Sequence, residues 1–307
     1  MNIKSLKIKE LFFIALFCFA AIIYGCKSEG GDGETADQEN IDSVEVDEDL
    51  MEDLNMAKQV FYSLPSPIET AMLMKRAGAK YDESILNPTE NRPNYTTNIS
   101  MALNLGVYSA DLSFASMFDQ SQATITYITT CKKLAEDLGI LNAISKTTIE
   151  RMETNVNNRD SLMEIISETF MNSNSFLKEN DRAETAAIIL VGGWVEGLYI
   201  ATKIARVTDK NDEMIERIID QRLSLSTLMS LLEQYEDDEN IVALMSDLSE
   251  FETVYEKVKV KTSKIEAVTD AETNKTTLKA TTESSITPEL FDELCDKVDK
   301  FRTKIVS

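Results

Sequence analysis

Apolar positions recur at spacings of three and four residues along most of this 307-residue chain, a period typical of amphipathic helices. Only ten Gly and five Pro interrupt the pattern. We expect an all-α fold, a bundle or array of about eight to ten helices, forming a single domain over residues 54–307. The expected helices share this spacing and cover residues 66–80, 97–118, 121–138, 141–155, 159–176, 181–207, 211–234, 239–260 and 288–306.

Two segments break the helical pattern. Residues 81–97 contain two proline turn sequences and are predicted to form a long loop. Residues 261–286 are rich in Thr, and a Thr-Asn-Lys turn lies between Val268 and Leu278. This pattern predicts a small β-hairpin insertion, and a Thr- and Lys-rich loop without strands is the alternative.

Two of the expected helices are unusually apolar. Ala186 to Val195 carries no charge over ten residues, too few to span a membrane, and is predicted to be a central buried helix. Gly192, Gly193 and Gly197 each cost a helix interior up to ~1 kcal/mol, so we expect them where another backbone approaches closely. The helix over 97–118 is apolar on two faces.

These two helices also resemble each other in sequence. At an offset of 86 residues, Gly106–Ala115 aligns with Gly192–Ala201, and both share the order Gly, aromatic, Leu, apolar, Ala. An internal duplication would make the two helices pseudo-equivalent partners at the centre of the bundle. Chance similarity between two buried helices is the alternative.

The net charge of −22 is unevenly distributed. Residues 27–53 hold twelve acidic residues and one basic residue, so residues 26–53 are predicted to be a disordered, extended acidic tether. The remaining 254 residues are only moderately acidic, with 40 acidic and 27 basic side chains. This balance excludes nucleic acid and anionic lipid headgroups as expected partners, because both require clustered Lys and Arg.

The chain contains no histidine, which removes the commonest acid–base group and the usual imidazole metal ligand. It also lacks a C-x-x-C pair, a P-loop and a dinucleotide-binding fingerprint. We therefore predict a protein that is not an enzyme, with no catalytic residues, no metal site and no cofactor. A hydrolase built on carboxylates alone is the remaining enzymatic alternative.

The candidate ligand pocket is built around two acidic residues within the apolar helices, Asp111 and Glu196. A buried carboxylate needs a partner, or its pKa rises. One interpretation places these two with Tyr108, Trp194 and Tyr199 around a polar pocket between the two helices, for a small molecule or cation. The other interpretation is that neighbouring Tyr, Arg or Lys groups satisfy each carboxylate, as part of the structure alone.

Two cysteines of the expected domain, Cys131 and Cys295, lie on apolar helical stripes. We expect two buried free thiols, and the alternative is a disulfide between them.

The N-terminus carries Lys4, Lys7 and Lys9, followed by an unbroken apolar run from Leu11 to Ile23. The next residues, Tyr-Gly-Cys, complete a sequence that resembles the lipobox of bacterial lipoproteins and ends at Cys26. The resemblance implies a signal peptide over residues 1–25, a diacylglyceryl group on the Cys26 sulfur and a third acyl chain, such as palmitate, on its amine. An ordinary secretory signal that precedes a cysteine is the alternative.

The acidic residues after Cys26 resemble the export signal of Bacteroidota surface lipoproteins. The segments NLGVYSADLSFA and GGWVEGLYIAT are similar to uncharacterised all-helical Bacteroidota lipoproteins, a group without an assigned activity. These resemblances imply an outer-membrane lipoprotein of the cell envelope, with the periplasmic and surface faces both open. We expect a binding or scaffold protein, attached to the membrane through the Cys26 lipid, with an envelope protein partner. A small-molecule or cation binder is the alternative function.

Overall fold

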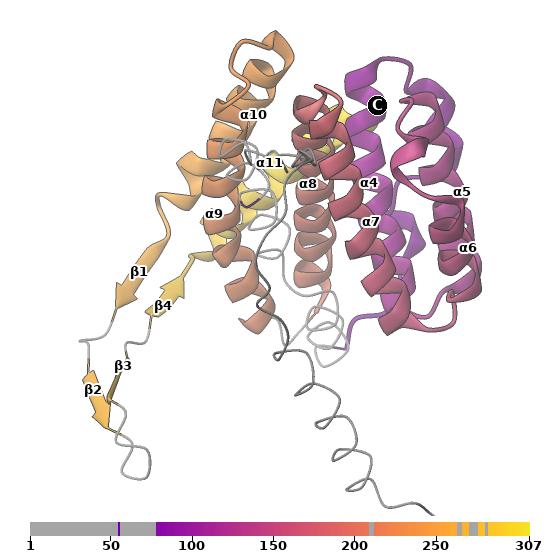
Figure 1. Ribbon diagram of the computed structural model, residues 1–307. Helices are drawn as coiled ribbons and strands as arrows, with labels where there is room; N and C mark the ends of the chain where they lie inside the picture. The colour runs from indigo at the N-terminus through magenta and orange to yellow at the C-terminus, as the bar shows by residue number, and fades with distance from the viewer. Residues whose placement is uncertain (1–54, 56–77, 209–211, 263–265, 270–275, 280–281) are drawn as a thin grey trace, which may run out of the picture. The chain divides into compact units, whose positions relative to one another are not determined.

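The all-α prediction is confirmed by a computed structural model that describes residues 55, 78–208, 212–262, 266–269, 276–279 and 282–307 (Figure 1). The described helices are α4 (Asn98–Met117), α5 (Ser121–Asp137), α6 (Lys146–Thr154), α7 (Arg159–Glu179), α8 (Ala183–Val207), α9 (Asp212–Glu233), α10 (Glu239–Tyr255) and α11 (Pro288–Val306). They belong to one compact unit. The predicted signal peptide, the tether and most of the predicted 66–80 helix lie outside the described residues.

Local capping explains where several helices begin. The Thr97 and Ser100 side chains form a capping box at the start of α4. Thr287 caps α11, whose first residue is proline. The predicted 141–155 helix is divided, because Ser145 caps α6 and leaves a short 3₁₀ helix, η3 (Leu141–Ala143), before it.

The predicted hairpin is confirmed as an antiparallel pair of strand segments between α10 and α11. Strand β1 (Lys259–Thr262) pairs with β4 (Thr282–Ser285), and β2 (Glu266–Thr269) pairs with β3 (Thr276–Lys279). Because Lys259 begins this pairing, α10 ends at Tyr255 and not at the predicted residue 260. The predicted turn lies outside the described residues.

The segment predicted as a long loop is organised by two 3₁₀ helices, η1 (Glu83–Ile85) and η2 (Thr89–Asn94). It packs against α5 through η2. The prediction of a loop is therefore correct in that the segment forms no α-helix, but it misses the two 3₁₀ helices.

The helices form two sets of four with matching neighbours, α4–α7 and α8–α11 (Figure 1). Helices α4 and α8 pack against each other at the centre, α5 packs on α4 as α9 packs on α8, and α6 and α10 occupy corresponding outer places. Helix α7 lies against both central helices, and so does α11. The β-hairpin is inserted before the last helix of the second set.

Two glycines allow the backbones of the central helices α4 and α8 to come into direct contact. A Cβ atom placed on Gly106 would lie 2.0 Å from the Ile189 carbonyl oxygen, and one on Gly192 would lie 2.0 Å from the Leu103 carbonyl oxygen. The offset of 86 residues relates both pairs to each other, so the contact is reciprocal, as around a two-fold axis. This geometry supports internal duplication over chance similarity. The expectation of close approach is wrong for Gly197, whose Cβ position has no atom within 4 Å.

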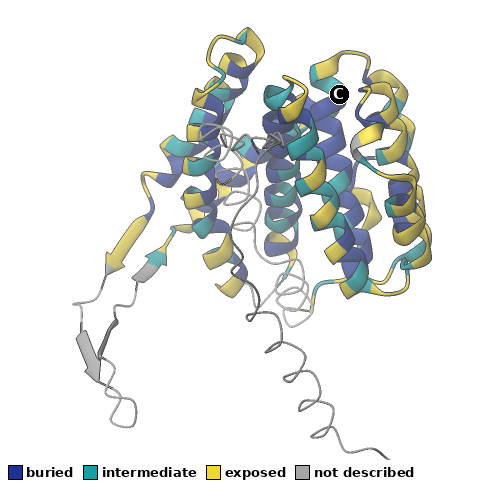
Figure 2. Ribbon diagram, in the orientation of Figure 1, coloured by how far each residue is buried: buried dark blue, intermediate teal, exposed yellow. Residues whose placement is uncertain are grey.

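Burial is concentrated on α4 and α8, whereas α5 and α6 expose one side (Figure 2). Eight of the ten residues between Ala186 and Val195 are buried, as predicted for a central helix. Among the described helices, α8 is long and apolar enough to cross a membrane. Because 78% of its most apolar window is buried inside the protein, α8 is better explained as a core helix.

Candidate functional site

Asp111 on α4 and Glu196 on α8 lie together at the centre of the protein, where both side chains are fully buried. The two carboxyl groups lie near enough that each affects the pKa of the other. The structure thus brings together the two acidic residues on which the sequence-based pocket was centred. We call Asn87, Asp111, Glu196 and Arg302 the central polar cluster.

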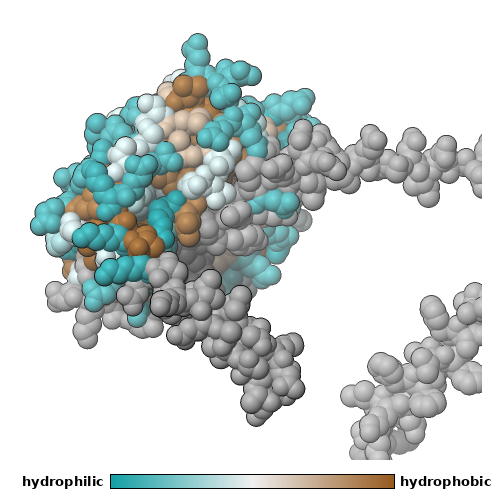
Figure 3. All heavy atoms as spheres, turned by 90° about the vertical axis from the view of Figure 1, so that its left-hand side faces the viewer, coloured by the Kyte–Doolittle hydropathy of each residue, from teal (hydrophilic) through white to brown (hydrophobic). Residues whose placement is uncertain are grey.

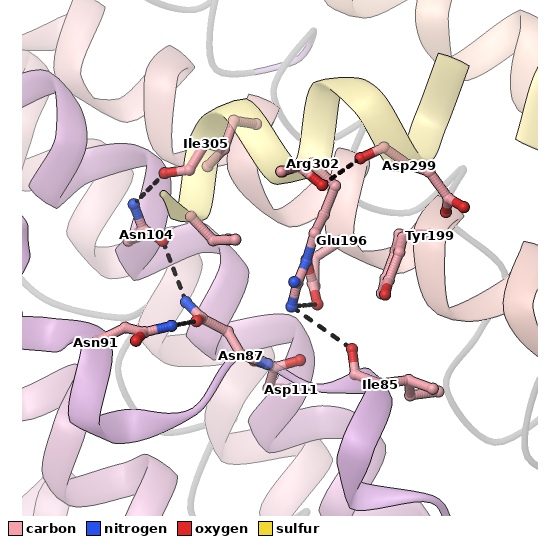
Figure 4. A network of polar contacts seen from close by, with 12 residues as sticks. Ile85, Asn87, Asn91, Asn104, Asp111, Glu196, Tyr199, Asp299, Arg302 and Ile305 are labelled. Carbon is pink, nitrogen blue, oxygen red and sulfur yellow. Dashed lines mark hydrogen bonds and ion pairs between the residues drawn. The ribbon is translucent and has the colours of Figure 1, made fainter. Parts of the chain in front are cut away.

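Arg302 of α11 supplies the positive charge of this cluster (Figure 4). Its Nε donates to Glu196 Oε2 at 3.0 Å and its Nη2 donates to Glu196 Oε1 at 3.2 Å. The guanidinium also lies 4.6 Å from the centre of the Tyr199 ring and contacts the Ile85 carbonyl oxygen at 3.5 Å. The two-point ion pair favours the ionised form of Glu196.

Asp111 has a different environment from its partner. Its Oδ2 accepts the backbone N–H of Asn87 at 3.1 Å, while no described donor group reaches its Oδ1. Burial, and then the neighbouring Glu196 charge, raises the pKa of Asp111 well above its ordinary value. Burial also raises the pKa of Glu196, but Arg302 opposes that effect. The two environments therefore favour a proton on Asp111 over a proton on Glu196.

Asn87 joins the 85–95 segment to the central helices. Its side-chain amide donates to the Tyr95 hydroxyl at 3.0 Å and to Asn104 Oδ1 at 3.2 Å, and it accepts from Asn91 at 2.9 Å. Asn104 in turn donates to the Ile305 carbonyl oxygen of α11 at 2.9 Å (Figure 4). This network connects the segment before α4 with the last helix of the chain.

Tyr108 lies at the edge of this network. Its hydroxyl donates to the Pro88 carbonyl oxygen at 2.9 Å, and its ring lies 6.2 Å from that of Tyr95 and 6.1 Å from that of Tyr127. Burial raises the pKa of Tyr108, so the hydroxyl stays a neutral donor. Tyr108 therefore holds the 85–95 segment on α4.

Trp194 was predicted to line the same pocket, and the structure places it elsewhere. Its ring packs edge-on against Phe251 of α10 at 5.8 Å, and Phe251 contacts Phe301 of α11. Two residues along a helix turn the side chain by about 200°, so Trp194 and Glu196 project from nearly opposite sides of α8. Tyr199, three residues after Glu196, shares its side and stacks with Arg302.

The sequence-based prediction missed Arg302 and Asn87. Arg302 lies four residues after Val298, which belongs to the apolar stripe of the last helix. This spacing places the Arg302 cation on the buried side of that helix. That spacing could have identified it. Asn87 stands before a proline and was interpreted only as a turn residue, although its side chain is fully buried.

Both cysteines of the domain are free thiols, so the disulfide alternative is wrong; Cys295 is buried as expected, whereas Cys131 is only partly buried. Cys131 lies on α5 and Cys295 on α11. Burial raises the pKa of Cys131 to about 12 and that of Cys295 to about 11, which makes both thiols poor nucleophiles.

A separate surface hollow of about 640 Å³ lies along α10 and α11, apart from the central polar cluster. Its acidic side chains include Glu250 and Glu293, which pair with Lys297 and Lys257. Within the described part of the chain, no group of three or more Cys, Asp and Glu side chains is arranged to hold a metal ion.

Comparison with known proteins gives no match to a family model, a curated protein or a solved structure.

Proposed function

We propose that this protein is a lipid-anchored binding or scaffold protein of the bacterial cell envelope, with a protein partner. The observation that carries the proposal is the N-terminal sequence, in which a charged segment and an apolar run end at the lipobox-like Cys26. Two or more acyl chains anchor a protein stably, whereas one chain does so only marginally. The acidic tether separates this anchor from the helical domain.

The central polar cluster supports a structural role for the two carboxyl groups. Both carboxylate oxygens of Glu196 accept hydrogen bonds from Arg302. The positive charge next to Glu196 is therefore the Arg302 guanidinium of the protein itself. Asp111 Oδ2 accepts the backbone N–H of Asn87. These contacts favour the interpretation without a ligand over a small-molecule or cation pocket between the central helices.

The exposed apolar side chains favour the second helix set as the partner surface. Leu223 on α9, Val242 on α10 and Val260 on β1 are 61%, 49% and 46% exposed, and Val207 at the end of α8 is exposed as well. Apolar residues are visible among polar ones on this side of the molecule (Figure 3). The comparable residue of the first set is Ile125, at 39%. A contiguous apolar patch is typical of a protein contact, and we propose that these side chains belong to one.

The proposal is tested by mild crosslinking in cells, followed by co-purification. We expect wild-type protein to capture a specific envelope protein, Leu223→Asp to lose it, and the matched control Ile125→Asp to keep it. A consistently monomeric, partner-free lipoprotein would contradict the scaffold function.

The alternative ligand-binding function is tested by fluorescence of Trp194, the only tryptophan in the chain. Because Trp194 lies in the core between α8 and α10, a ligand that reorganises the central helices should change its emission. We expect divalent cations to leave the signal unchanged, and Asp111→Asn to change stability alone. A saturable signal that Asp111→Asn abolishes would favour the pocket instead.

A further inference from the structure

We propose that Asp111 and Glu196 hold a single proton between them at neutral pH, and that loss of this proton releases the 85–95 segment from α4. The proposal concerns a conformational response within the domain and is independent of the lipid anchor and of any partner.

The arrangement of the buried charges favours a proton on the carboxyl pair. Two fully buried carboxyl groups interact electrostatically, one guanidinium pairs with Glu196, and the Oδ1 atom of Asp111 has no described hydrogen-bond partner. Two neighbouring ionised carboxylates would repel each other, and Arg302 already engages both oxygens of Glu196. A proton on Asp111 Oδ1 makes the cluster electrically neutral and gives that oxygen the hydrogen bond that no described donor supplies.

The 85–95 segment is the part of the surroundings most easily displaced. Asp111, Glu196 and Arg302 lie on the long helices α4, α8 and α11, whereas this segment contains only the short turns η1 and η2. Its Asn87 N–H contacts Asp111 directly, and its Ile85 carbonyl contacts Arg302. An ionised, buried Asp111 needs hydration, and local opening of a short segment exposes it without unfolding a helix.

The other titratable groups that face Asp111 do not change charge in the neutral range. They interact with it electrostatically and comprise Tyr81, Tyr108, Tyr127, Cys131, Glu196 and Arg302. Burial raises the pKa of Tyr81 and that of Cys131 to about 12 each, and raises the pKa values of Tyr108 and Tyr127 as well. Arg302 stays charged, because its pKa is raised by Glu196 against the effect of burial. Of these groups, the carboxyl pair alone can respond between about pH 5 and pH 9.

The test compares wild-type protein with Asp111→Asn by amide hydrogen exchange. The asparagine amide can donate to Glu196 and accept from Asn87, but it has no proton to lose at these pH values. Exchange is followed between about pH 5 and pH 9 in peptides covering 82–97, with peptides from α10 as the reference for the intrinsic pH dependence. In the wild type, we expect exchange of the 85–95 segment to rise relative to the reference by up to about tenfold per pH unit, the limit for one proton. In Asp111→Asn, the ratio should stay constant.

A second measurement on the wild type alone covers the case in which the variant misfolds. The infrared band of a protonated carboxyl group should be present at neutral pH and should disappear over the same pH range in which exchange of the 85–95 segment increases. The proposal is overturned if this band is absent at neutral pH. It is also overturned if the segment and the reference respond to pH in parallel, or if a folded Asp111→Asn variant shows the wild-type slope.

Discussion

Arg302 is the residue on which the buried charges of this protein depend. Its side chain is only 12% exposed, and it contacts Glu196, the Tyr199 ring and the 85–95 segment at once. Removing one partner of a buried ion pair leaves an uncompensated charge, which is far more destabilising than the loss of a surface pair. Lys304, an exposed residue of the same helix, pairs with Asp247 of α10 and provides the comparison.

We predict that Arg302→Met lowers the free energy of unfolding by about 3–5 kcal/mol. Arg302→Lys should cost less, because it keeps the charge and loses the two-point geometry and the ring contact. Lys304→Met is the control and should change stability by less than about 1 kcal/mol, since this side chain is 63% exposed. Urea unfolding measures all three. Equal effects of Arg302→Met and Lys304→Met would show that the buried pair has no special role.

The pH dependence of stability follows from the same cluster. The folded pKa of Asp111 is raised above its unfolded value of about 3.9, so its stabilising contribution is complete below about pH 4 and is lost as the pH rises through the folded pKa. We predict that Asp111→Asn becomes progressively more stable than the wild type as the pH rises, by up to ~1.4 kcal/mol per pH unit. Urea unfolding of both proteins at several pH values measures this difference. A constant difference across the range would refute the raised pKa.

At the scale of the elements, the close crossing of α4 and α8 organises the whole fold. The two glycines at the crossing occupy equivalent positions of the two helix sets, and each faces a carbonyl oxygen of the other helix. No side chain fits there without a backbone shift. The arrangement also explains why the sequence similarity is concentrated in these two helices.

We predict that Gly106→Ala and Gly192→Ala each destabilise the protein by about 3 kcal/mol or more, because the new Cβ atom would overlap backbone atoms. Gly197→Ala is the control, in the same helix as Gly192 with open space around its Cβ position. It should stabilise the protein by about 0.5–1 kcal/mol through helix propensity. Thermal unfolding distinguishes the three variants. Similar effects at Gly192 and Gly197 would contradict the close crossing.

Sequence patterns predicted the elements better than the contacts between them. The helical period located α4, α5 and α11 to within a residue or so, because this signal is local. Pairing Asp111 with Glu196 was possible because both interrupt apolar helices. The wrong placement of Trp194 came from proximity along the chain, which does not determine the side of a helix. The role of Asn87 depends on partners from distant parts of the chain, which no local pattern reveals.

At the scale of the whole molecule, the proposed anchor and the proposed partner surface belong to different parts of the chain. Cys26 and the acidic tether precede the domain, and the exposed apolar side chains lie mainly on the second helix set and β1. A long, charged tether is expected to be extended, so it would give the domain reach from the membrane. Protease treatment of intact cells decides between the two faces of the outer membrane, because only a surface-exposed domain is degraded.

The most direct test of the proposed function is the intact mass of the mature protein, isolated from the membrane fraction of cells that express the full chain. We predict a chain that begins at Cys26 and carries three acyl chains, and a Cys26→Ser variant that lacks acylation and is not recovered as the mature membrane form. A mature wild-type chain that begins at another residue, or that carries no lipid, would contradict the proposal.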